Sequence, residues 1–322
     1  MFIGYLQKAA KGRIIPSPEY THPLPKWNLC ITGYWTLIVD NLAASPVNTL
    51  AAIRYDLPIG VFDSGVGGLT VAAALRRRLP AENLLYLGDS ARLPYGTKAP
   101  STIIQYVLRA ARFFTARGVK MMVLACNTAS AHAVTALKLH YPDLPVLGVI
   151  DAGADRAAAL SPQGRIVVAA TEGTCRSGAF DDAITALRPT AHVTPVPCPL
   201  FVALVEEGLT EGPIAEAMIR QYLASQFQGP EAADCLVLGC THFPLLGQAL
   251  RQVLGPHPIL VDCAEAVAEQ AAAMLAEHHL LALGGLGRTH LVTTDGATRF
   301  SAQAGRFFPS LGDAPPVELV DL

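Results

Sequence analysis

The chain has 322 residues, of which 51% are hydrophobic and 16% are charged, and its formal net charge is −2. This length is enough for about two domains of ~150 residues each. The near-neutral charge gives no sign of a nucleic-acid or membrane-surface partner, and no apolar run reaches the ~18 to 20 residues of a membrane span. The seven cysteines are odd in number and widely spaced, which predicts free thiols in a reducing cytoplasm and no disulfide framework.

Residues 1–54 differ in pattern from the rest of the chain. Prolines at positions 16, 18, 23 and 25 interrupt any regular element and separate the basic residues from the apolar run at 29–39. That separation argues against a signal peptide. We expect a poorly ordered or loosely docked extension, or upstream sequence included by a misplaced start, and assign it no function.

From Pro58 onward, apolar runs of strand length alternate with helix-like stretches. The first set of expected strands is at 59–62, 84–87, 121–125 and 146–150, with helices such as 69–79 and 102–116. A second set is at 166–170, 192–196, 235–239 and 259–261, with helices at 180–187, 213–227 and 243–254. Such alternation predicts parallel sheets with helices on both faces.

The second set of strands repeats the first in the same order and at a nearly constant offset, which indicates an internal duplication. We therefore predict an α/β fold with two similar lobes, each a mainly parallel sheet flanked by helices. A pseudo-twofold axis would relate the lobes, with the active site in the cleft between them. The first lobe would hold 55–150 plus 263–322, and the second 151–262. The stretches 264–283 and 298–308 are expected to be helices that return to the first lobe.

Two near-copies of one motif end in chemically useful side chains. The segments MMVLACNT and CLVLGCTH each place a cysteine, Cys126 or Cys240, after an apolar run and before a helical pattern. Active sites of α/β proteins lie at the carboxyl ends of strands, and a helix N-terminus should lower a thiol's pKa. A thiolate and a thiol on opposite walls of a cleft can remove a proton from one face of a carbon centre and return one to the other.

Other polar loops come after the neighbouring strands, namely Asp63–Gly68, Asp89 with the Pro94–Gly96 turn, and Thr171–Thr174. If the lobes face each other, these loops converge with the cysteines. Backbone N–H groups at the helix starts would then bind an anion, most simply a carboxylate.

Other kinds of site fit these residues less well. The glycine-rich loop at 63–68 has neither the G-x-G-x-x-G pattern nor the G-K-[ST] ending of nucleotide sites. A zinc site of Cys126, Cys240 and His242 lacks a C-x-x-C pair and a fourth ligand, and a redox pair would usually be closer in sequence. No lysine lies in a convincing pyridoxal-phosphate context, so we expect neither cofactor nor metal. The other five cysteines fit the role of small buried hydrophobes: Cys30, Cys175, Cys198, Cys235 and Cys263.

Several motifs resemble those of glutamate racemase over about residues 57 to 310. They are the two cysteine segments, the polar loops that follow the strands, Val205–Gly208 and the string GCTHFPLL at 239–246. The resemblance implies a bacterial cytoplasmic enzyme that interconverts L- and D-glutamate without a cofactor and supplies D-glutamate for peptidoglycan. It implies Cys126 and Cys240 as the two acid/bases, one for each enantiomer, with Asp63 supporting Cys126, His242 supporting Cys240, and Glu206 assisting. It also implies substrate contacts from Asp63, Ser64, Tyr95, Gly96, Asn127, Thr128, Thr171, Thr174, Thr241 and His242, and a structural role for Asp89.

Relatives are often dimers, so we expect a homodimer that binds glutamate and neither nucleic acid nor membrane.

Some alternatives for the function stay open. The paired cysteines are shared with aspartate racemase and other isomerases of the superfamily. A non-catalytic role is also possible, since some relatives bind DNA gyrase.

Overall fold

The computed structural model describes residues 55–322, and the expected extension at 1–54 lies outside the described residues. A six-stranded sheet has the order β10-β9-β2-β1-β3-β4, with every neighbouring pair parallel. Its strands are β1 (Ile59–Asp63), β2 (Leu84–Gly88), β3 (Met121–Leu124), β4 (Val146–Gly148), β9 (Thr289–Thr293) and β10 (Val317–Leu319). This sheet carries one half of the candidate site at the carboxyl ends of its strands.

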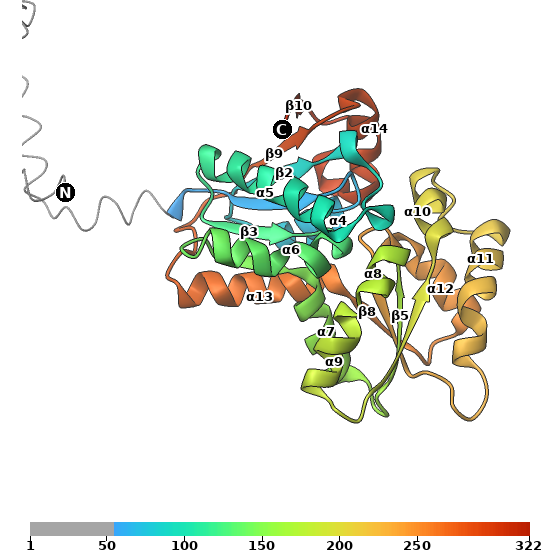
Figure 1. Cartoon of the computed structure of the whole chain (residues 1–322). Helices are drawn as coiled ribbons and strands as arrows, with labels where there is room; N and C mark the ends of the chain where they lie inside the picture. The colour runs from blue at the N-terminus through green and yellow to red at the C-terminus, as the bar shows by residue number, and fades with distance from the viewer. Residues whose placement is uncertain (1–54) are drawn as a thin grey trace, which may run out of the picture. The chain divides into compact units, whose positions relative to one another are not determined.

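The central strands β1, β2 and β3 are buried on both sides because helices cover both faces of the six-stranded sheet. Val61 of β1 packs in the core with α4 (Leu69–Arg78) and α13 (Cys263–Glu277). Its neighbour Phe62 points to the opposite face and packs in a second core with α5 (Pro100–Arg117) and α6 (Asn127–His140). Figure 1 shows these helices around the sheet.

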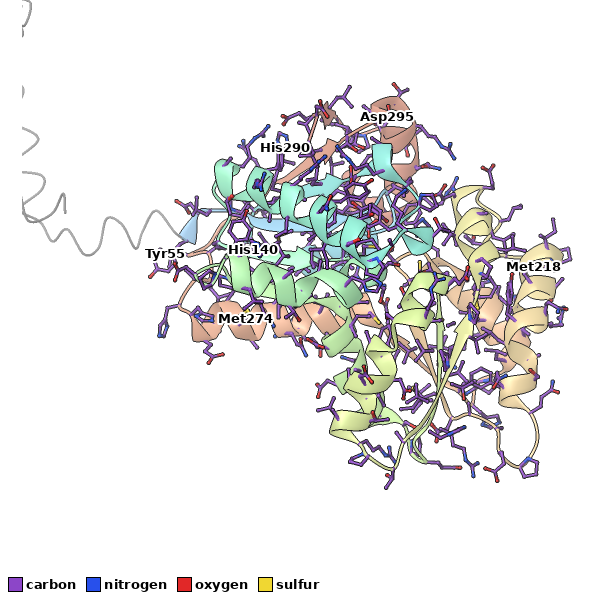
Figure 2. The ribbon with its side chains drawn as sticks, viewed as in Figure 1. Tyr55, His140, Met218, Met274, His290 and Asp295 are labelled. Carbon is purple, nitrogen blue, oxygen red and sulfur yellow. The ribbon has the colours of Figure 1, made fainter. Side chains whose placement is uncertain are left out.

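A four-stranded parallel sheet of order β6-β5-β7-β8 carries the other half of the site. Its strands are β5 (Arg165–Ala170), β6 (His192–Pro197), β7 (Cys235–Gly239) and β8 (Ile259–Asp262). The helices around it are α7 (Val149–Leu160), α8 (Glu172–Ser177), α9 (Ala179–Leu187), α10 (Pro199–Glu206), α11 (Pro213–Leu223) and α12 (Gly247–Leu254). Figure 2 shows the side chains, with Met218 on α11 and Met274 on α13.

The predicted fold class, α/β with two parallel sheets flanked by helices, is confirmed. The order β2-β1-β3-β4 in the larger sheet matches the order β6-β5-β7-β8 in the smaller one, as an internal duplication would produce. The twofold relation and the boundaries of the two lobes stay predictions. Among residues 55–322, no helix is long and apolar enough to cross a membrane.

The main error concerns the C-terminal part, which the sequence predicted to be only helical. The helix expected at 264–283 ends at Glu277, and β9 and β10 come after it, flanking α14 (Ala297–Phe307). These strands add to the larger sheet beside β2, outside the repeated set of four, so the duplication does not predict them. Smaller errors are residues 149–150, which begin α7, and two stretches that are 3-10 turns, Ala224–Phe227 and Phe243–Leu246.

Candidate active site

A cavity of about 370 Å³ lies where loops from the carboxyl ends of strands in both sheets meet. Cys126, which lies just after β3, and Cys240, which lies just after β7, both line this cavity. The other predicted residues that line it are Ser64, Tyr95, Gly96, Asn127, Thr128, Thr171, Glu206, Thr241 and His242. Asp63 and Thr174 are not part of the lining.

Cys126 caps the first turn of α6, and its Sγ atom accepts a hydrogen bond of 3.4 Å from the Ala129 N–H. Burial raises the pKa of this thiol to about 12, and the negative charge of Asp63 adds to the effect. Hydrogen bonds from Ala129 and Ser64 oppose the shift without cancelling it. The expected lowering of the pKa at the helix N-terminus is therefore wrong for Cys126, because loss of solvent outweighs the helix contribution.

Asp63 ends β1 directly behind the cavity and is 1% exposed. Its Oδ2 atom accepts a hydrogen bond of 3.0 Å from the Gly65 N–H, while Oδ1 has no partner among the described residues. Burial raises the pKa of this carboxyl, although the charge of His242 and nearby backbone N–H groups oppose the shift. A carboxylate with a raised pKa accepts a proton more readily than an exposed one. The tight turn needs Gly68, since a Cβ there would lie 2.4 Å from the Asp63 Cβ.

The thiol of Cys240 has a different neighbour, since its Sγ atom lies 3.8 Å from the Nδ1 atom of His242. The Nε2 atom of the same ring lies 3.3 Å from Oε1 of Glu206, which is ion-pair distance but not good hydrogen-bond geometry. Burial opposes the charge on His242, but contacts with Cys240 and Glu206 and the charge of Asp63 outweigh it and raise the pKa to about 10. The raised pKa keeps the imidazole protonated beside the Glu206 carboxylate.

Asp89, which directly follows β2, is fully buried and holds the neighbouring loop together. It accepts hydrogen bonds from the Tyr95 hydroxyl (2.6 Å), Arg92 Nη1 (2.7 Å) and Thr294 Oγ1 (2.8 Å). The Tyr95 hydroxyl is therefore engaged with Asp89, and Tyr95 is also among the residues that line the cavity. These contacts agree with a structural role for Asp89.

Three threonine hydroxyls join the two halves of the site. Thr128 Oγ1 lies 3.0 Å from both Thr171 Oγ1 and Thr174 Oγ1, and the latter two are 3.1 Å apart. Nearby, the Oδ1 atom of the 4% exposed Asn127 has no hydrogen-bond partner within residues 55–322. These groups offer donors and acceptors to a polar ligand.

The sequence missed one wall of the cavity. It is formed by Pro199, Val202 and Ala203 of α10, with Glu172 and Leu93 nearby. Helix α10 comes after the carboxyl end of β6 as the Asp89–Gly96 loop comes after β2, so the strand-end rule could have identified it.

The remaining cysteines lie outside this site. Cys198, Cys235 and Cys263 are buried as expected, whereas Cys175 is partly exposed, and all six cysteines of the described part are free thiols. Cys30 lies outside the described residues. No group of three His, Cys, Asp or Glu side chains within 55–322 is arranged to hold a metal ion.

The family profile described as "Asp/Glu/Hydantoin racemase" matches residues 68–271. The chain belongs to the Asp/Glu racemase family. Within it, the glutamate racemase of Geobacter metallireducens is 44% identical over 81% of this chain and 96% of its own length. The expected assignment to the glutamate racemases of this family is thereby confirmed.

Solved structures of the family share the fold. A crystal structure of glutamate racemase from Francisella tularensis in complex with D-glutamate has 33% identity and a TM-score of 0.76, covering 83% of this chain and 98% of its own. One from Thermus thermophilus in complex with beta-chloro-D-alanine has 40% identity and a TM-score of 0.74, over 83% and 98% of the two chains. The two parallel sheets flanked by helices are those of glutamate racemases.

Proposed function

We propose that this chain interconverts L- and D-glutamate by direct proton transfer at the α-carbon, with Cys126 and Cys240 as the two acid/bases. The observation that carries the proposal is that both thiols line one cavity, each from the end of a buried strand in a different sheet. The similarity to glutamate racemases supports glutamate as the substrate.

In each direction, one cysteine acts as thiolate and removes the α-proton, which breaks the C–H bond and leaves the electron pair on the substrate. The other cysteine, as thiol, donates its proton to the opposite face, so that the configuration inverts. Each enantiomer meets a different cysteine as base, and the two thiols exchange roles with every turnover. The sum of the two transfers leaves the substrate with the same atoms and the enzyme with its proton moved from one sulfur to the other.

The neighbours of each sulfur fit this division of labour. His242, held as a cation beside Glu206, lies next to Cys240 and can exchange a proton with its sulfur. Asp63 takes the corresponding place beside Cys126, where its raised pKa suits a group that accepts the thiol proton. Asp63, His242 and Glu206 are therefore assigned as assisting residues.

The carboxylates of the substrate would be held without a lysine or arginine side chain, since none of the described part lines the cavity. Hydroxyls of the threonines and Ser64, the Asn127 amide and backbone N–H groups at the starts of α6 and α8 remain to bind its carboxylates. We assign substrate contacts to Ser64, Tyr95, Gly96, Asn127, Thr128, Thr171 and Thr241, with Asp63, His242 and Thr174 behind or beside them. Fixed donors around the carboxylate stabilise the carbanion-like state that makes the α-proton removable.

In the cell, this activity would supply D-glutamate for peptidoglycan synthesis in the cytoplasm. We propose a homodimer as the working form. Sedimentation of the purified chain tests that separately from activity.

The experiment is to incubate the purified chain with L-glutamate, reductant and no added cofactor, and to separate the enantiomers by chiral chromatography. Formation of D-glutamate up to an equal mixture supports the proposal. If aspartate were racemised and glutamate were not, the assignment of substrate would be wrong. If neither enantiomer of either amino acid changed, both the assigned substrate and the assigned roles of the two thiols would be wrong.

A further inference from the structure

Helix α14 belongs to the larger sheet but reaches the catalytic groups of the smaller one. It lies between β9 and β10 in the chain, after the loop that contains Asp295, which Figure 2 labels. The ring of Phe300 packs on Tyr86 of β2 at 6.0 Å, and Ser301 Oγ donates a hydrogen bond to the Pro315 carbonyl. Figure 1 shows α14 in red beside these strands. The first part of the helix is thus fixed to the larger sheet.

The last turn of α14 holds the end of α10. Nη1 of Arg306 donates hydrogen bonds to the carbonyl oxygens of Val205 (2.9 Å) and Glu206 (2.7 Å). These carbonyls belong to the last turn of α10, where backbone acceptors lack partners within the helix and a cation is favourable. Arg306 therefore binds the backbone of the same residue whose carboxylate faces His242.

The neighbouring residue on α14 contacts the imidazole itself. The ring of Phe307 meets the His242 ring edge to face, with centroids 5.3 Å apart and planes at 82°. Phe307 is buried and carries no charge. It therefore limits the tilt of the imidazole but not the position of the carboxylate beside it.

Packing alone does not fix the Glu206 side chain. A second cavity of about 190 Å³ borders it on the α14 side, with Ser90, Arg299 and Gln303 on its walls. Arg299, which is largely exposed, lies 3.7 Å from the other carboxylate oxygen of Glu206 and would attract it away from the imidazole. The carboxylate stays near His242 only if the backbone that carries it is held.

We propose that Arg306 is a positioning residue, which holds the end of α10 so that the Glu206 carboxylate stays in contact with His242 beside Cys240. The inference rests on the proposed roles of Glu206 and His242. It assigns to a residue outside the cavity lining a part in the half of the reaction that uses Cys240.

The first test is a double-mutant cycle on kcat/KM for glutamate. Arg306→Ala should lower kcat/KM by about tenfold, the usual order of loss when a supporting group is misplaced. Arg306→Lys keeps a cationic donor and should recover activity to within about threefold of the wild type. In a Glu206→Gln background, Arg306→Ala should add less than about a twofold loss, because the carboxylate that it positions is gone.

The matched control is Arg251→Ala. Nη1 of Arg251 also donates to two backbone carbonyls, those of Pro256 and Pro258, but at the end of α12 and away from the cavity. This variant should keep the wild-type kcat/KM. Wild-type activity in Arg306→Ala, or the same tenfold loss with and without the Glu206 carboxylate, would overturn the proposal.

The second test does not depend on turnover and tracks the His242 titration by 15N NMR. The titratable and charged groups that face this imidazole are Cys240 just after β7, Asp63 from β1 and Glu206 from α10, with Arg299 beyond the last. Of these, Arg306→Ala should displace only Glu206, so the apparent pKa of His242 should fall, and Arg251→Ala should leave it unchanged. An unchanged titration in Arg306→Ala would contradict the inference. A wild-type chain inactive on glutamate would instead contradict the proposed function, and the titration would still test Arg306.

Discussion

The Sγ atom of Cys240 lies 3.8 Å from the Nδ1 atom of His242. Its counterpart Cys126 has a backbone N–H and the buried carboxyl of Asp63 as its neighbours. One cavity thus contains two thiols of unlike surroundings, a cationic ring beside one and an acidic group beside the other. The proposed reaction is symmetric, whereas the two thiols that would perform it have different surroundings, and this difference can be measured.

Removing the charge of Asp63 should make Cys126 more reactive. Burial and the Asp63 charge together raise the thiol's pKa to about 12, so Asp63→Asn should lower it while keeping the acceptor for the Gly65 N–H. Alkylation of Cys126 by iodoacetamide at pH 8 to 9, measured by peptide mass spectrometry, should be several-fold faster in the variant, while racemisation falls. The peptide that contains the partly exposed Cys175 is the internal control in the same digest. An unchanged Cys126 rate would show that Asp63 does not act on this thiol.

The Glu206–His242 pair should stabilise the fold in a pH-dependent way. The folded-state pKa of His242, about 10, lies above its unfolded value of about 6.5. The stability that the charged ring gains from Glu206 is therefore fully present below pH ~6.5 for as long as Glu206 stays ionised, and it is lost as the pH rises through about 10. The difference in free energy of unfolding between the wild type and Glu206→Gln, from urea titrations, should shrink across this window.

A surface pair on α11 provides the control for that experiment. Oε2 of Glu216 lies 2.8 Å from Nη2 of Arg220. The arginine stays charged throughout the same pH range. The difference between the wild type and Glu216→Gln should not change between pH 6.5 and 10. If the Glu206→Gln difference were equally constant, the ring would not be a cation held by that carboxylate.

Gly67 should tolerate no side chain, because a Cβ there would lie 2.4 Å from His242 Cε1 and 2.5 Å from Thr241 Oγ1. Gly67→Ala should displace the imidazole, lower kcat/KM by more than about tenfold and cost about 1–3 kcal/mol of stability. Gly247→Ala is the matched control, since it has a helical φ of −53° and no atom within 4 Å of the added Cβ. That variant should be as stable as the wild type or slightly more so. Normal activity in Gly67→Ala would mean that the ring position is not critical.

Either cysteine should be indispensable. Cys126→Ser and Cys240→Ser replace a thiol by a hydroxyl that is far too weak an acid to ionise near neutral pH, and Cys126→Ala and Cys240→Ala remove the acid altogether. Racemisation in a chiral assay should fall by about 10²–10⁴-fold or more in each variant. The partly exposed Cys175, changed to serine, should keep wild-type activity. Near-normal turnover in either active-site variant would refute the two-base assignment.

Much of this site could be predicted from the sequence for a simple physical reason. Buried parallel strands are apolar runs, and the residues after them must lie at one edge of the sheet, so Cys126 and Cys240 could be placed without coordinates. The pKa of Cys126 could not, because it depends on how completely the folded chain excludes water from the sulfur.

The structure of the C-terminal segment is a second feature that could not be predicted from the sequence. β9 and β10 are short strands outside the repeated pattern, and their pairing partners lie far away in the chain. The contacts of Arg306 with the end of α10 depend on where α14 packs, which neither periodicity nor spacing reveals.

The most direct test of the two-thiol account is the isotopic content of both enantiomers early in the reaction. Pure L-glutamate is incubated with the chain in D₂O, and the reaction is stopped when about a tenth is converted. Because the acid is a different, solvent-equilibrated thiol from the base, the D-glutamate formed should carry deuterium at the α-carbon while the remaining L-glutamate keeps its proton. α-Proton retained in the product, or deuterium in the remaining substrate at a comparable level, would show that a single group acts on both faces.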